Sequence, residues 1–600
     1  RMETEKSWQE KEARRRRLSE KMGAALMAGS MIWTPGGPLS WAFVLGGGIA
    51  ISQQQTAYAQ DTSTYSSATY TSDIVGNSGT TSDGVNVIVS AANGGTDYPS
   101  IRSGGSNGSV YGIKNTTAGG TAQSASVTID TGKMGAVYGG YVESGGSATS
   151  NSVTVNGGAI GNTRDGTVVG GYVTSSTATS VGTAAGNSVT IDHSANNSGT
   201  TSINGNVYGG WIMIGSAAIV SGNSVTIRET GGTTSVSGTV FGGMVANGTV
   251  SSNSVTVSGG TTNAVCGGAA NNGTVSGNSV TVSGGAISYL VVGGWVDSST
   301  VTSVGTAAGN SVTIDHTADS GTTRVSGTVF GGWIRNGSAA IVSGNSVTIR
   351  ETGGTTSVSG TVFGGMVANG TVSSNSVTVN GGTIGTNSGF VYGGYVESGS
   401  ATNNSVTISG GTISGRNISV GDYAGGVYGG DVENAGSATN NAGTISGGII
   451  SGGVYGGYVE NAGSATNNSV TVENNSITVN GGTIAAAVVG GEVTNQSVTN
   501  NSVTVENNSV AVSGGTIAAA VGGGEARSGT VNGNSVTVSG GTIGIIVYGG
   551  YVESGIVNGN SVTVSGGTIG NTVYGGCVER GIVTGNSVPV RGGTIGNTVY

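Results

Sequence analysis

A short alternation of apolar and polar residues recurs along most of the chain. One clear copy is the run Asn560-Ser561-Val562-Thr563-Val564, in which the two valines alternate with a serine and a threonine. A period of two places alternate side chains on opposite faces of a β-strand. We therefore predict a short strand whose valines face inward and whose threonine faces outward.

Two more strand-like runs complete this repeat. The run Thr568–Tyr574 follows one Gly-Gly pair, and a second Gly-Gly pair introduces Cys577-Val578-Glu579. Glycine adopts positive φ without steric cost, so we predict a corner of the chain at each pair. The segment before each Asn varies in length, which is typical of a loop that projects from one corner.

The repeat has a regular period near the C-terminus and a looser one upstream. Asn534, Asn560 and Asn586 open successive copies 26 residues apart. Further copies open 25 to 36 residues apart where units are complete, at Asn151, Asn187, Asn223, Asn253, Asn278, Asn310, Asn345, Asn375, Asn404, Asn468 and Asn501, with Asn440–Thr444 as a degraded copy. Gly215–Val257 is identical to Gly337–Val379, which indicates an internal duplication.

Together these features predict an all-β protein, a right-handed parallel β-helix (β-solenoid) of Gly-rich repeats. One repeat cannot bury its few valines alone, but copies stacked about 4.8 Å apart form continuous apolar ladders. Three short runs per unit suit a triangular coil. The alternative is an antiparallel β-hairpin repeat array, because Val547-Tyr-Gly-Gly-Tyr-Val552 also matches a two-residue hairpin turn.

The N-terminal residues 1–60 are predicted to be an extended signal peptide. The basic run Arg14–Arg17 is followed by an apolar stretch without charged residues between Met22 and Gln60, and Ala57-Tyr58-Ala59 is a small-x-small cleavage motif. We expect cleavage near Ala59. The alternative is a membrane anchor.

We expect residues 61–125 to form an N-terminal cap or irregular region and residues 126–600 to form the solenoid, which is truncated in mid-repeat at Tyr600. The chain contains 120 Gly but only four Pro, and its Gly does not recur at every third position, which excludes collagen. Its net charge of −9 disfavours nucleic acid and anionic lipid as partners. Cys266 and Cys577 lie far apart in different phases of the repeat, so we expect no disulfide.

Few residues are candidates for chemistry. His193 and His316 both follow Ile-Asp in near-identical settings, and we interpret them as a surface histidine that was duplicated with its repeat. We assign Glu143, Glu397, Glu433, Glu460, Glu492, Glu553 and Glu579 to one phase after Gly-Gly-x-Val, and interpret them as a solvated stripe rather than as Ca²⁺ ligands or a glycan-cleaving pair. Tyr138, Tyr208, Tyr392, Tyr428, Tyr455, Tyr548 and Tyr574 share another phase and are expected to pack against one another. We assign no catalytic, cofactor-binding or metal-binding residue and expect no enzymatic activity.

The basic leader, the Ala57-Tyr58-Ala59 motif and the long run of Asn-Ser-Val-Thr-Val-x-Gly-Gly-Thr-Ile repeats resemble the passenger region of a bacterial autotransporter or a similar type V secreted adhesin. The resemblance implies a β-helix on the bacterial cell surface, at the outer membrane or in the extracellular medium. It also implies an outer-membrane β-barrel translocator as partner, supplied by a missing C-terminal part or by a separate chain, because no barrel pattern occurs here. A host or matrix surface is a further expected partner.

From these observations we expect a surface-exposed or secreted passenger with a structural or adhesive role. Two alternatives stay open: a glycan-active β-helix enzyme, and a ligand-free matrix or surface-layer repeat protein. An enzyme would concentrate unusual polar residues on a few adjacent repeats, whereas here they are spread along the chain.

Overall fold

The structure is a computed structural model of the chain. It describes residues 106–600 apart from gaps at 162–165, 175–180, 194–198, 215–216, 298–304, 319–320, 338, 386–388, 415–424, 435, 462–468 and 496–501, together with the short segments 57–58, 62–65, 69–70, 73–77, 85–89 and 100–103. The predicted signal peptide lies almost entirely outside the described residues. The regular structure of the described residues is β-strand throughout, and no helix among them is long and apolar enough to cross a membrane.

The chain divides into two units. Unit 1 consists of Arg1–Gly215, Asn223–Phe241 and Gly260–Asn263, and unit 2 consists of Ser216–Gly222, Gly242–Gly259 and Ala264–Tyr600. In each unit the chain coils so that one turn, or rung, stacks on the next. The rungs contribute strands to up to four rows, which we number in chain order starting from the Ser-Val-Thr-Val run.

The strands of unit 1 fall into these rows. The first row contains β2 (Thr62–Tyr65), β5 (Asn86–Val89), β10 (Ser126–Ile129), β14 (Ser152–Val155), β18 (Ser188–Ile191) and β22 (Ser224–Ile227). The second row contains β3 (Thr69–Tyr70), β6 (Ser100–Ser103), β11 (Lys133–Met134), β15 (Gly158–Ile160) and β19 (Thr200–Ile203). The third row contains β1 (Ala57–Tyr58), β4 (Ile74–Asn77), β8 (Val110–Asn115), β12 (Val137–Val142), β16 (Val168–Val173) and β20 (Val207–Ile212), and the fourth contains β9 (Thr121–Gln123), β13 (Gly146–Thr149) and β17 (Gly182–Ala185). Parallel strands of the coil are thus already present within 61–125.

The strands of unit 2 repeat the same order. The first row contains β27 (Ser311–Ile314), β31 (Ser346–Ile349), β34 (Ser376–Val379), β37 (Ser405–Ile408), β41 (Ala442–Ile445), β45 (Ser476–Val479), β49 (Ser509–Val512), β52 (Ser535–Val538) and β55 (Ser561–Val564). The second row contains β28 (Thr322–Val325), β32 (Thr355–Val358), β35 (Thr383–Ile384), β38 (Thr412–Ile413), β42 (Ile449–Ile450), β46 (Thr483–Ile484), β50 (Thr516–Ile517), β53 (Thr542–Ile543), β56 (Thr568–Ile569) and β58 (Thr594–Ile595).

The third row of unit 2 contains β29 (Thr328–Ile334), β33 (Val362–Ser373), β36 (Val391–Thr402), β39 (Val427–Val432), β43 (Val454–Asn461), β47 (Val488–Asn495), β51 (Val521–Asn532), β54 (Val547–Asn558) and β57 (Val573–Thr584). The fourth row contains β21 (Ala218–Ser221), β26 (Thr306–Ala308), β30 (Ala340–Ser343), β40 (Gly436–Thr439), β44 (Ser469–Glu473) and β48 (Ser502–Glu506). The long strands β23 (Thr233–Ser251), β24 (Ser254–Ser276) and β25 (Ser279–Val296) run through several rows.

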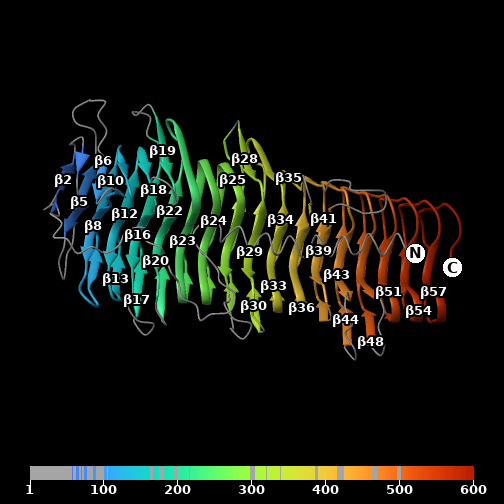
Figure 1. Cartoon of the computed structure of the whole chain (residues 1–600). Helices are drawn as coiled ribbons and strands as arrows, with labels where there is room; N and C mark the ends of the chain where they lie inside the picture. Colours follow the sequence, from blue (N-terminus) through green and yellow to red (C-terminus); the bar gives the residue numbers. More distant parts are fainter. Residues whose placement is uncertain are drawn as a thin grey trace. The chain divides into compact units, whose positions relative to one another are not determined.

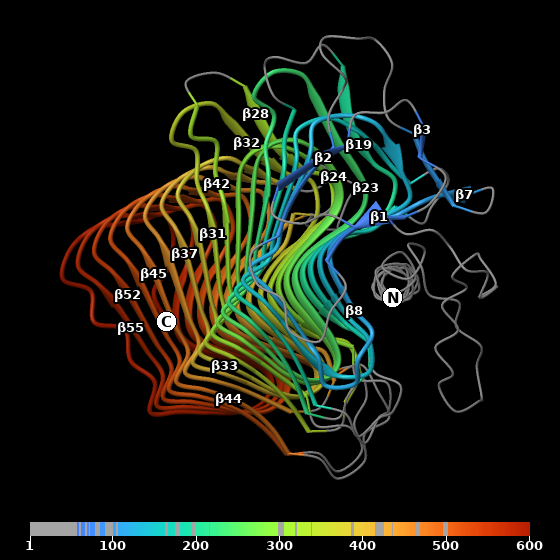
Figure 2. The same ribbon diagram turned by 90° about the vertical axis from the view of Figure 1, so that its left-hand side faces the viewer.

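Strands of neighbouring rungs pair in parallel and in register. Ser535–Val538 pairs with Ser561–Val564, and the same register joins β31, β37, β45 and their neighbours in Figure 2. The predicted parallel β-helix is therefore confirmed, and the hairpin array is not observed in the described residues. A single short antiparallel pairing, β6 with β7 (Ser106–Asn107), lies outside this pattern. Figure 1 shows the resulting rows of arrows in unit 2, for example from β33 to β57.

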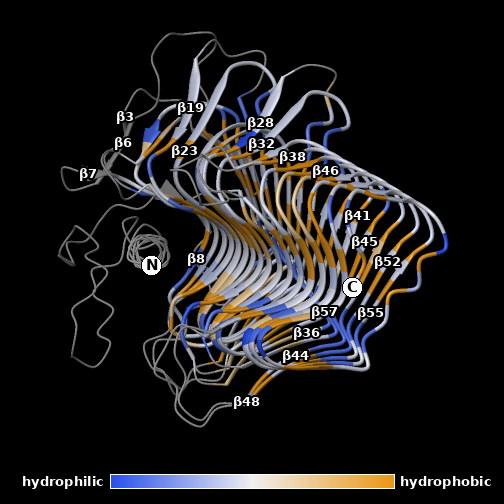
Figure 3. Cartoon of the chain, turned by 90° about the vertical axis from the view of Figure 1, so that its right-hand side faces the viewer, coloured by the Kyte–Doolittle hydropathy of each residue, from blue (hydrophilic) through white to orange (hydrophobic). Residues whose placement is uncertain are grey.

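The predicted inward and outward faces of the Ser-Val-Thr-Val strand are confirmed. Val536 and Val538 are buried, and Thr537 between them is exposed. The hydropathy colours show the same separation, with apolar bands following the rungs of unit 2 near β45 and β52 (Figure 3). Because the register is kept from rung to rung, valines and isoleucines of neighbouring rungs lie above one another, as Val536 and Val562 do.

The segment before each Asn differs from the prediction. We expected a projecting loop and a triangular coil, but a fourth row of strands lies there in many rungs. The residue three positions before the Asn is a buried Ala or Val, for example Ala438, Val505 and Val531. A small apolar side chain at this position gives the segment an inward face, which is why it pairs as a strand.

Stacked asparagine side chains form a ladder in each unit. Asn151, Asn187 and Asn223 form it in unit 1, and Asn253, Asn278, Asn310, Asn345, Asn375, Asn404, Asn441, Asn475, Asn508, Asn534, Asn560 and Asn586 form it in unit 2. The amide of Asn508 donates to Asn534 Oδ1 at 2.9 Å and to the Val472 carbonyl at 3.1 Å. Its own Oδ1 accepts the backbone and side-chain N–H groups of Asn475. The buried amide is thus fully hydrogen-bonded, as burial of a polar group requires.

The ladder corrects the predicted register in two rungs. We expected copies to open at Asn468 and Asn501, but the ladder passes through Asn475 and Asn508, and the degraded copy contributes Asn441 as a full member. The first Asn-Ser-Val run of each pair instead supplies a fourth-row strand, β44 or β48. The run that precedes Gly-Gly-Thr-Ile is the one that enters the ladder.

The two Gly-Gly pairs of a rung require glycine for different physical reasons. In the pair after the first strand, Gly567 has a φ of 78°, so this pair makes the predicted corner. The pair inside the third strand is not a corner. A Cβ on Gly549 would lie 2.4 Å from the Gly575 carbonyl oxygen, and one on Gly550 would lie 2.8 Å from Cγ of Asn560. Glycine is required there because the asparagine ladder packs directly against the backbone.

The inward assignment predicts a large difference between neighbouring substitutions. Val536→Asp places an unpaired carboxylate in the core and should lower the free energy of unfolding by several kcal/mol, on the order of 3 or more. Thr537→Asp is exposed and should change it by less than about 0.5 kcal/mol. Urea denaturation followed by circular dichroism measures both, and equal losses at the two positions would contradict the assignment.

The asparagine ladder predicts a second pair of results. Asn508→Ala removes the amide that donates to the Val472 carbonyl and the oxygen that accepts from the backbone and side-chain N–H groups of Asn475, and should cost at least about 2 kcal/mol. Asn480→Ala is the matched control, because this exposed amide only accepts a hydrogen bond from Ser513. An Asn508→Ala variant as stable as the control would show that the ladder contributes nothing to stability.

Candidate functional site

The third strand row of unit 2 carries three columns of side chains that could support chemistry. The first column contains the residue that directly follows the Val of each Val-x-Gly-Gly run: Phe330, Phe363, Tyr392, Tyr428, Tyr455, Val489, Gly522, Tyr548 and Tyr574. The second column follows Gly-Gly: Trp333, Met366, Tyr395, Asp431, Tyr458, Glu492, Glu525, Tyr551 and Cys577. The third lies two residues further: Arg335, Ala368, Glu397, Glu433, Glu460, Thr494, Arg527, Glu553 and Glu579.

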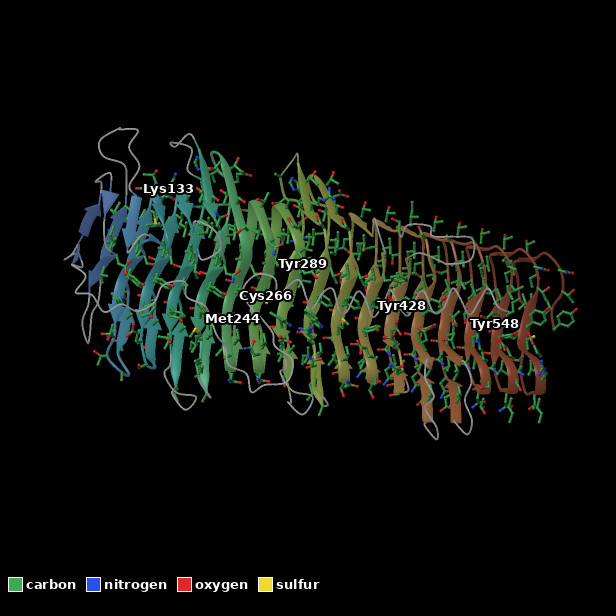
Figure 4. The ribbon with its side chains drawn as sticks, in the orientation of Figure 1. Lys133, Met244, Cys266, Tyr289, Tyr428 and Tyr548 are labelled. Carbon is green, nitrogen blue, oxygen red and sulfur yellow. The ribbon has the colours of Figure 1, made fainter. Side chains whose placement is uncertain are left out.

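The rings of the first column stack on one another. Phe330 and Phe363 are 5.0 Å apart between ring centroids with planes 5° apart, and Phe363 and Tyr392 are 5.0 Å apart with planes 7° apart. Tyr392, Tyr428 and Tyr455 continue the stack at 4.9 Å for each step. Figure 4 marks Tyr428 and Tyr548 on their rungs.

The same packing occurs in unit 1. Tyr111 stacks on Tyr138 at 5.0 Å, and Tyr208 stacks on Phe241 at 5.1 Å. The sequence prediction that these tyrosines pack together is confirmed. Burial raises the pKa of Tyr138 to about 12, so its phenol stays protonated in neutral solution.

Several carboxylates of these columns accept hydrogen bonds from tyrosines. The Tyr395 hydroxyl donates to Glu433, and the Tyr551 hydroxyl donates to Glu579 at 2.9 Å. The predicted solvated stripe is therefore only partly observed: Glu553 and Glu579 are exposed, but Glu397, Glu433 and Glu460 are half-buried.

Glu492 does not belong to the predicted stripe. It directly follows Gly490-Gly491, so it lies in the second column in register with Tyr458 on one side and Glu525 on the other. The predicted position in this rung is taken by Thr494, which is in register with Glu460. The sequence does contain the signal, because Gly-Gly-Glu replaces Gly-Gly-Tyr at both Glu492 and Glu525.

Glu492 and Glu525 are neighbours on adjacent rungs where the aromatic stack is interrupted. The first column has Val489 and Gly522 in these rungs. The ring of Tyr548 packs directly against Gly522, where a Cβ would lie only 2.3 Å from that ring. The Tyr548 hydroxyl donates a hydrogen bond to Glu525. Two half-buried carboxylates are thus enclosed by aromatic and apolar groups.

This environment favours the protonated form of both carboxyl groups. Burial, followed by the charges of Glu525 and Glu460, holds the pKa of Glu492 well above its ordinary value of 4.5. Burial likewise raises the pKa of Glu525, with Glu553 adding to the effect, while Tyr548 and Arg527 oppose it. A pair of this kind can share a proton or act as an acid, and it attracts cations when ionised.

The described residues contain no group of three or more His, Cys, Asp or Glu side chains that could hold a metal ion. Both cysteines are free, Cys266 buried and Cys577 half-buried, and burial raises the pKa of each thiol. Neither thiol has the lowered pKa of a reactive cysteine.

The two histidines are buried, which corrects the prediction of surface residues. His193 is 1% exposed and His316 is 6% exposed. Their Nδ1 atoms lie 3.3 Å and 3.0 Å from the hydroxyl oxygens of Thr201 and Thr323. Each histidine is therefore held inside its rung by a threonine of the second row.

The aspartate beside each histidine is part of an ion pair that the sequence analysis missed. Asp192 Oδ2 accepts from Arg228 Nε at 2.8 Å, and Asp315 Oδ2 accepts from Arg350 Nε at the same distance. Each aspartate also accepts the backbone N–H of its own histidine at 2.8 Å, not the ring N–H. The carboxylate therefore does not orient the imidazole as in a Ser–His–Asp site.

No protein-family model matches this chain, and no curated protein and no solved structure matches it.

The Glu492–Glu525 pair predicts an unusual dependence of stability on pH. Both pKa values are raised in the folded chain, so the folded state binds more protons than the unfolded state above pH 4.5. The contribution of this pair to stability should therefore be fully present below pH 4.5 and be lost as the pH rises through the folded pKa values. The urea midpoint, measured over a series of pH values, should show this decline.

Variants separate the pair from the general charge of the protein. Glu525→Gln removes the repulsion and should flatten the decline, as should Glu492→Gln. Glu579→Gln is the control, because this glutamate is exposed and lies one rung beyond Glu553, away from the pair. A pH profile that is unchanged in both Gln variants of the pair would show that these carboxyl groups do not titrate as described.

Proposed function

We propose that this chain is an exported, surface-displayed protein whose β-solenoid has a structural and adhesive role. The observation that carries the proposal is how its polar and aromatic side chains are used. The asparagines, the stacked tyrosines and most of the glutamates described above bond to or stack on the neighbouring rung. Such a chain is built to maintain a long repetitive surface, which suits a passenger that presents many equal contacts to a host or matrix surface.

The remaining elements of the proposal rest on the N-terminal sequence. The basic leader and the Ala57-Tyr58-Ala59 motif support export, and the repeat resembles autotransporter passengers. The partner that fits this route is an outer-membrane β-barrel translocator. A ligand-free matrix or surface-layer role uses the same architecture and differs only in the absence of a receptor.

One observation favours a second candidate, a glycan-active enzyme. Glu492 and Glu525 lie in register on adjacent strands, whose spacing is about 4.8 Å, and retaining glycosidases hold two carboxyl groups about 5 Å apart. Tyr458 and Tyr548 border the pair, and aromatic rings commonly pack against sugars. This pair is where such an activity would reside.

Display on a bacterial surface tests the adhesive role. Cells that display the chain should attach to matrix-coated or host-cell surfaces several-fold better than cells without it. Thr537→Asp should keep this attachment, and the core variant Val536→Asp should lose it at equal surface amount. Attachment that does not depend on the displayed chain would refute the adhesive role and leave a matrix role.

The enzyme alternative needs a separate assay. We expect the purified chain to leave a panel of polysaccharides intact. Turnover that disappears in Glu525→Gln or Glu492→Gln but persists in Glu553→Gln would replace the adhesive proposal with the glycan-active one.

A further inference from the structure

Three tyrosines of unit 2 stack directly on successive rungs. The ring centroids of Tyr392 and Tyr428 are 4.9 Å apart with planes 20° apart, and those of Tyr428 and Tyr455 are 4.9 Å apart with planes 16° apart. Their backbones are paired in register, so each residue lies above its equivalent. The ortho carbon of one phenol therefore faces the ortho carbon of the next across about one strand spacing, ~4.8 Å.

We propose that Tyr392, Tyr428 and Tyr455 are a site of oxidative modification, at which dityrosine bonds join adjacent rungs. This inference goes beyond the proposed adhesive role and does not depend on it. The co-reactant is a one-electron oxidant supplied from outside, such as a peroxidase acting with hydrogen peroxide.

The reaction is balanced by the loss of two hydrogen atoms. Each of two phenols gives up one electron and one proton and becomes a phenoxyl radical. The peroxide takes the two electrons and two protons and is reduced to water. The radicals then join through a C–C bond between ortho carbons, and each ring regains aromaticity when its displaced ring hydrogen moves to the phenol oxygen.

The neighbouring residues give the oxidant access to the stack. Tyr428 is 9% exposed and Tyr392 is 4% exposed, whereas Tyr455 and Tyr458 are half-buried and more accessible. The ring of Tyr458 lies 5.4 Å from that of Tyr455 and 5.5 Å from that of Tyr428, in edge-on contact with both. An electron lost at the exposed end can therefore be replaced from the buried rings, which carries the radical into the stack.

The same column contains its own negative controls. Phe363 stacks on Tyr392 at 5.0 Å with planes 7° apart, in the same arrangement but without a phenol. Beyond Tyr455 the column continues with Val489 and Gly522, which carry no ring. In this stretch of the column the modification joins three consecutive rungs, where it would act as a covalent staple against unfolding. Tyr574 and Tyr600 stack in the same way, 5.1 Å apart with planes 8° apart, as do Tyr111 and Tyr138 in unit 1, so these two pairs should cross-link as well.

The test uses the purified full chain, oxidised in dilute solution with peroxidase and hydrogen peroxide. Cleavage after Glu397, Glu433 and Glu460 separates the three tyrosines into different peptides. We expect dityrosine fluorescence in the monomer and, by tandem mass spectrometry, peptide pairs two hydrogens lighter than their sum, joining Tyr392 to Tyr428 and Tyr428 to Tyr455. The oxidised chain should also unfold at a higher urea concentration than the untreated chain.

Tyr428→Phe is the decisive variant, because phenylalanine already occupies this column at Phe330 and Phe363 and should fold normally. It should remove both cross-links and leave those of the separate pairs Tyr574–Tyr600 and Tyr111–Tyr138 in place. Tyr392→Phe should remove one cross-link and keep the bond between Tyr428 and Tyr455. The proposal would be overturned if Tyr392, Tyr428 and Tyr455 carry no cross-link under conditions that join Tyr574 to Tyr600, if they are joined only between chains, or if a cross-link between Tyr392 and Tyr455 forms in Tyr428→Phe.

Discussion

The parallel, in-register pairing of neighbouring rungs is the constraint on which the rest of the structure depends. It places each residue about 4.8 Å from its equivalent in the next rung, so like side chains are forced to stack. Whether a residue type can occupy a column then depends on how its side chain interacts with an identical side chain on the next rung. Valine and tyrosine gain from such contact, and asparagine gains most because its amide both donates and accepts. The ladder through Asn508 and Asn534 uses every one of these groups.

A carboxylate fails the same requirement, since it only accepts hydrogen bonds and repels its copy. The glutamates of unit 2 meet this difficulty in two ways. In the third column Thr494 and Arg527 separate Glu460 from Glu553, so the acidic run is interrupted. In the second column Glu492 and Glu525 are direct neighbours, and burial raises the pKa of both, so protonation takes the place of separation. Glu492 and Glu525 therefore conflict with the stacking rule and are also the carboxylate pair best suited to chemistry.

The two-residue alternation in the sequence predicted the faces of the strands, but contacts between distant segments were missed. The inward Val536, the outward Thr537 and the stacking of Tyr392 on Tyr428 result from alternation and a shared phase. The choice of Asn475 over Asn468 could not be read from the run itself, because both begin Asn-Ser, and only the following Gly-Gly-Thr-Ile distinguishes them. The burial of His193 was missed because its partner Thr201 lies beyond a variable segment. Export, adhesion and the translocator partner remain predictions.

The duplicated ion pairs indicate the size of the unit that is copied in such a chain. Asp192 bonds to Arg228, and Asp315 bonds to Arg350, in each case across one rung to the next. A copy of one rung alone would place a buried aspartate without its arginine, which would cost several kcal/mol. Ser180–His193 is identical to Ser303–His316, just as Gly215–Val257 is identical to Gly337–Val379, so both rungs were duplicated together. Contacts between unlike residues on adjacent rungs thus set a lower limit of two rungs for a stable duplication, whereas the asparagine ladder, which joins like residues, sets no such limit.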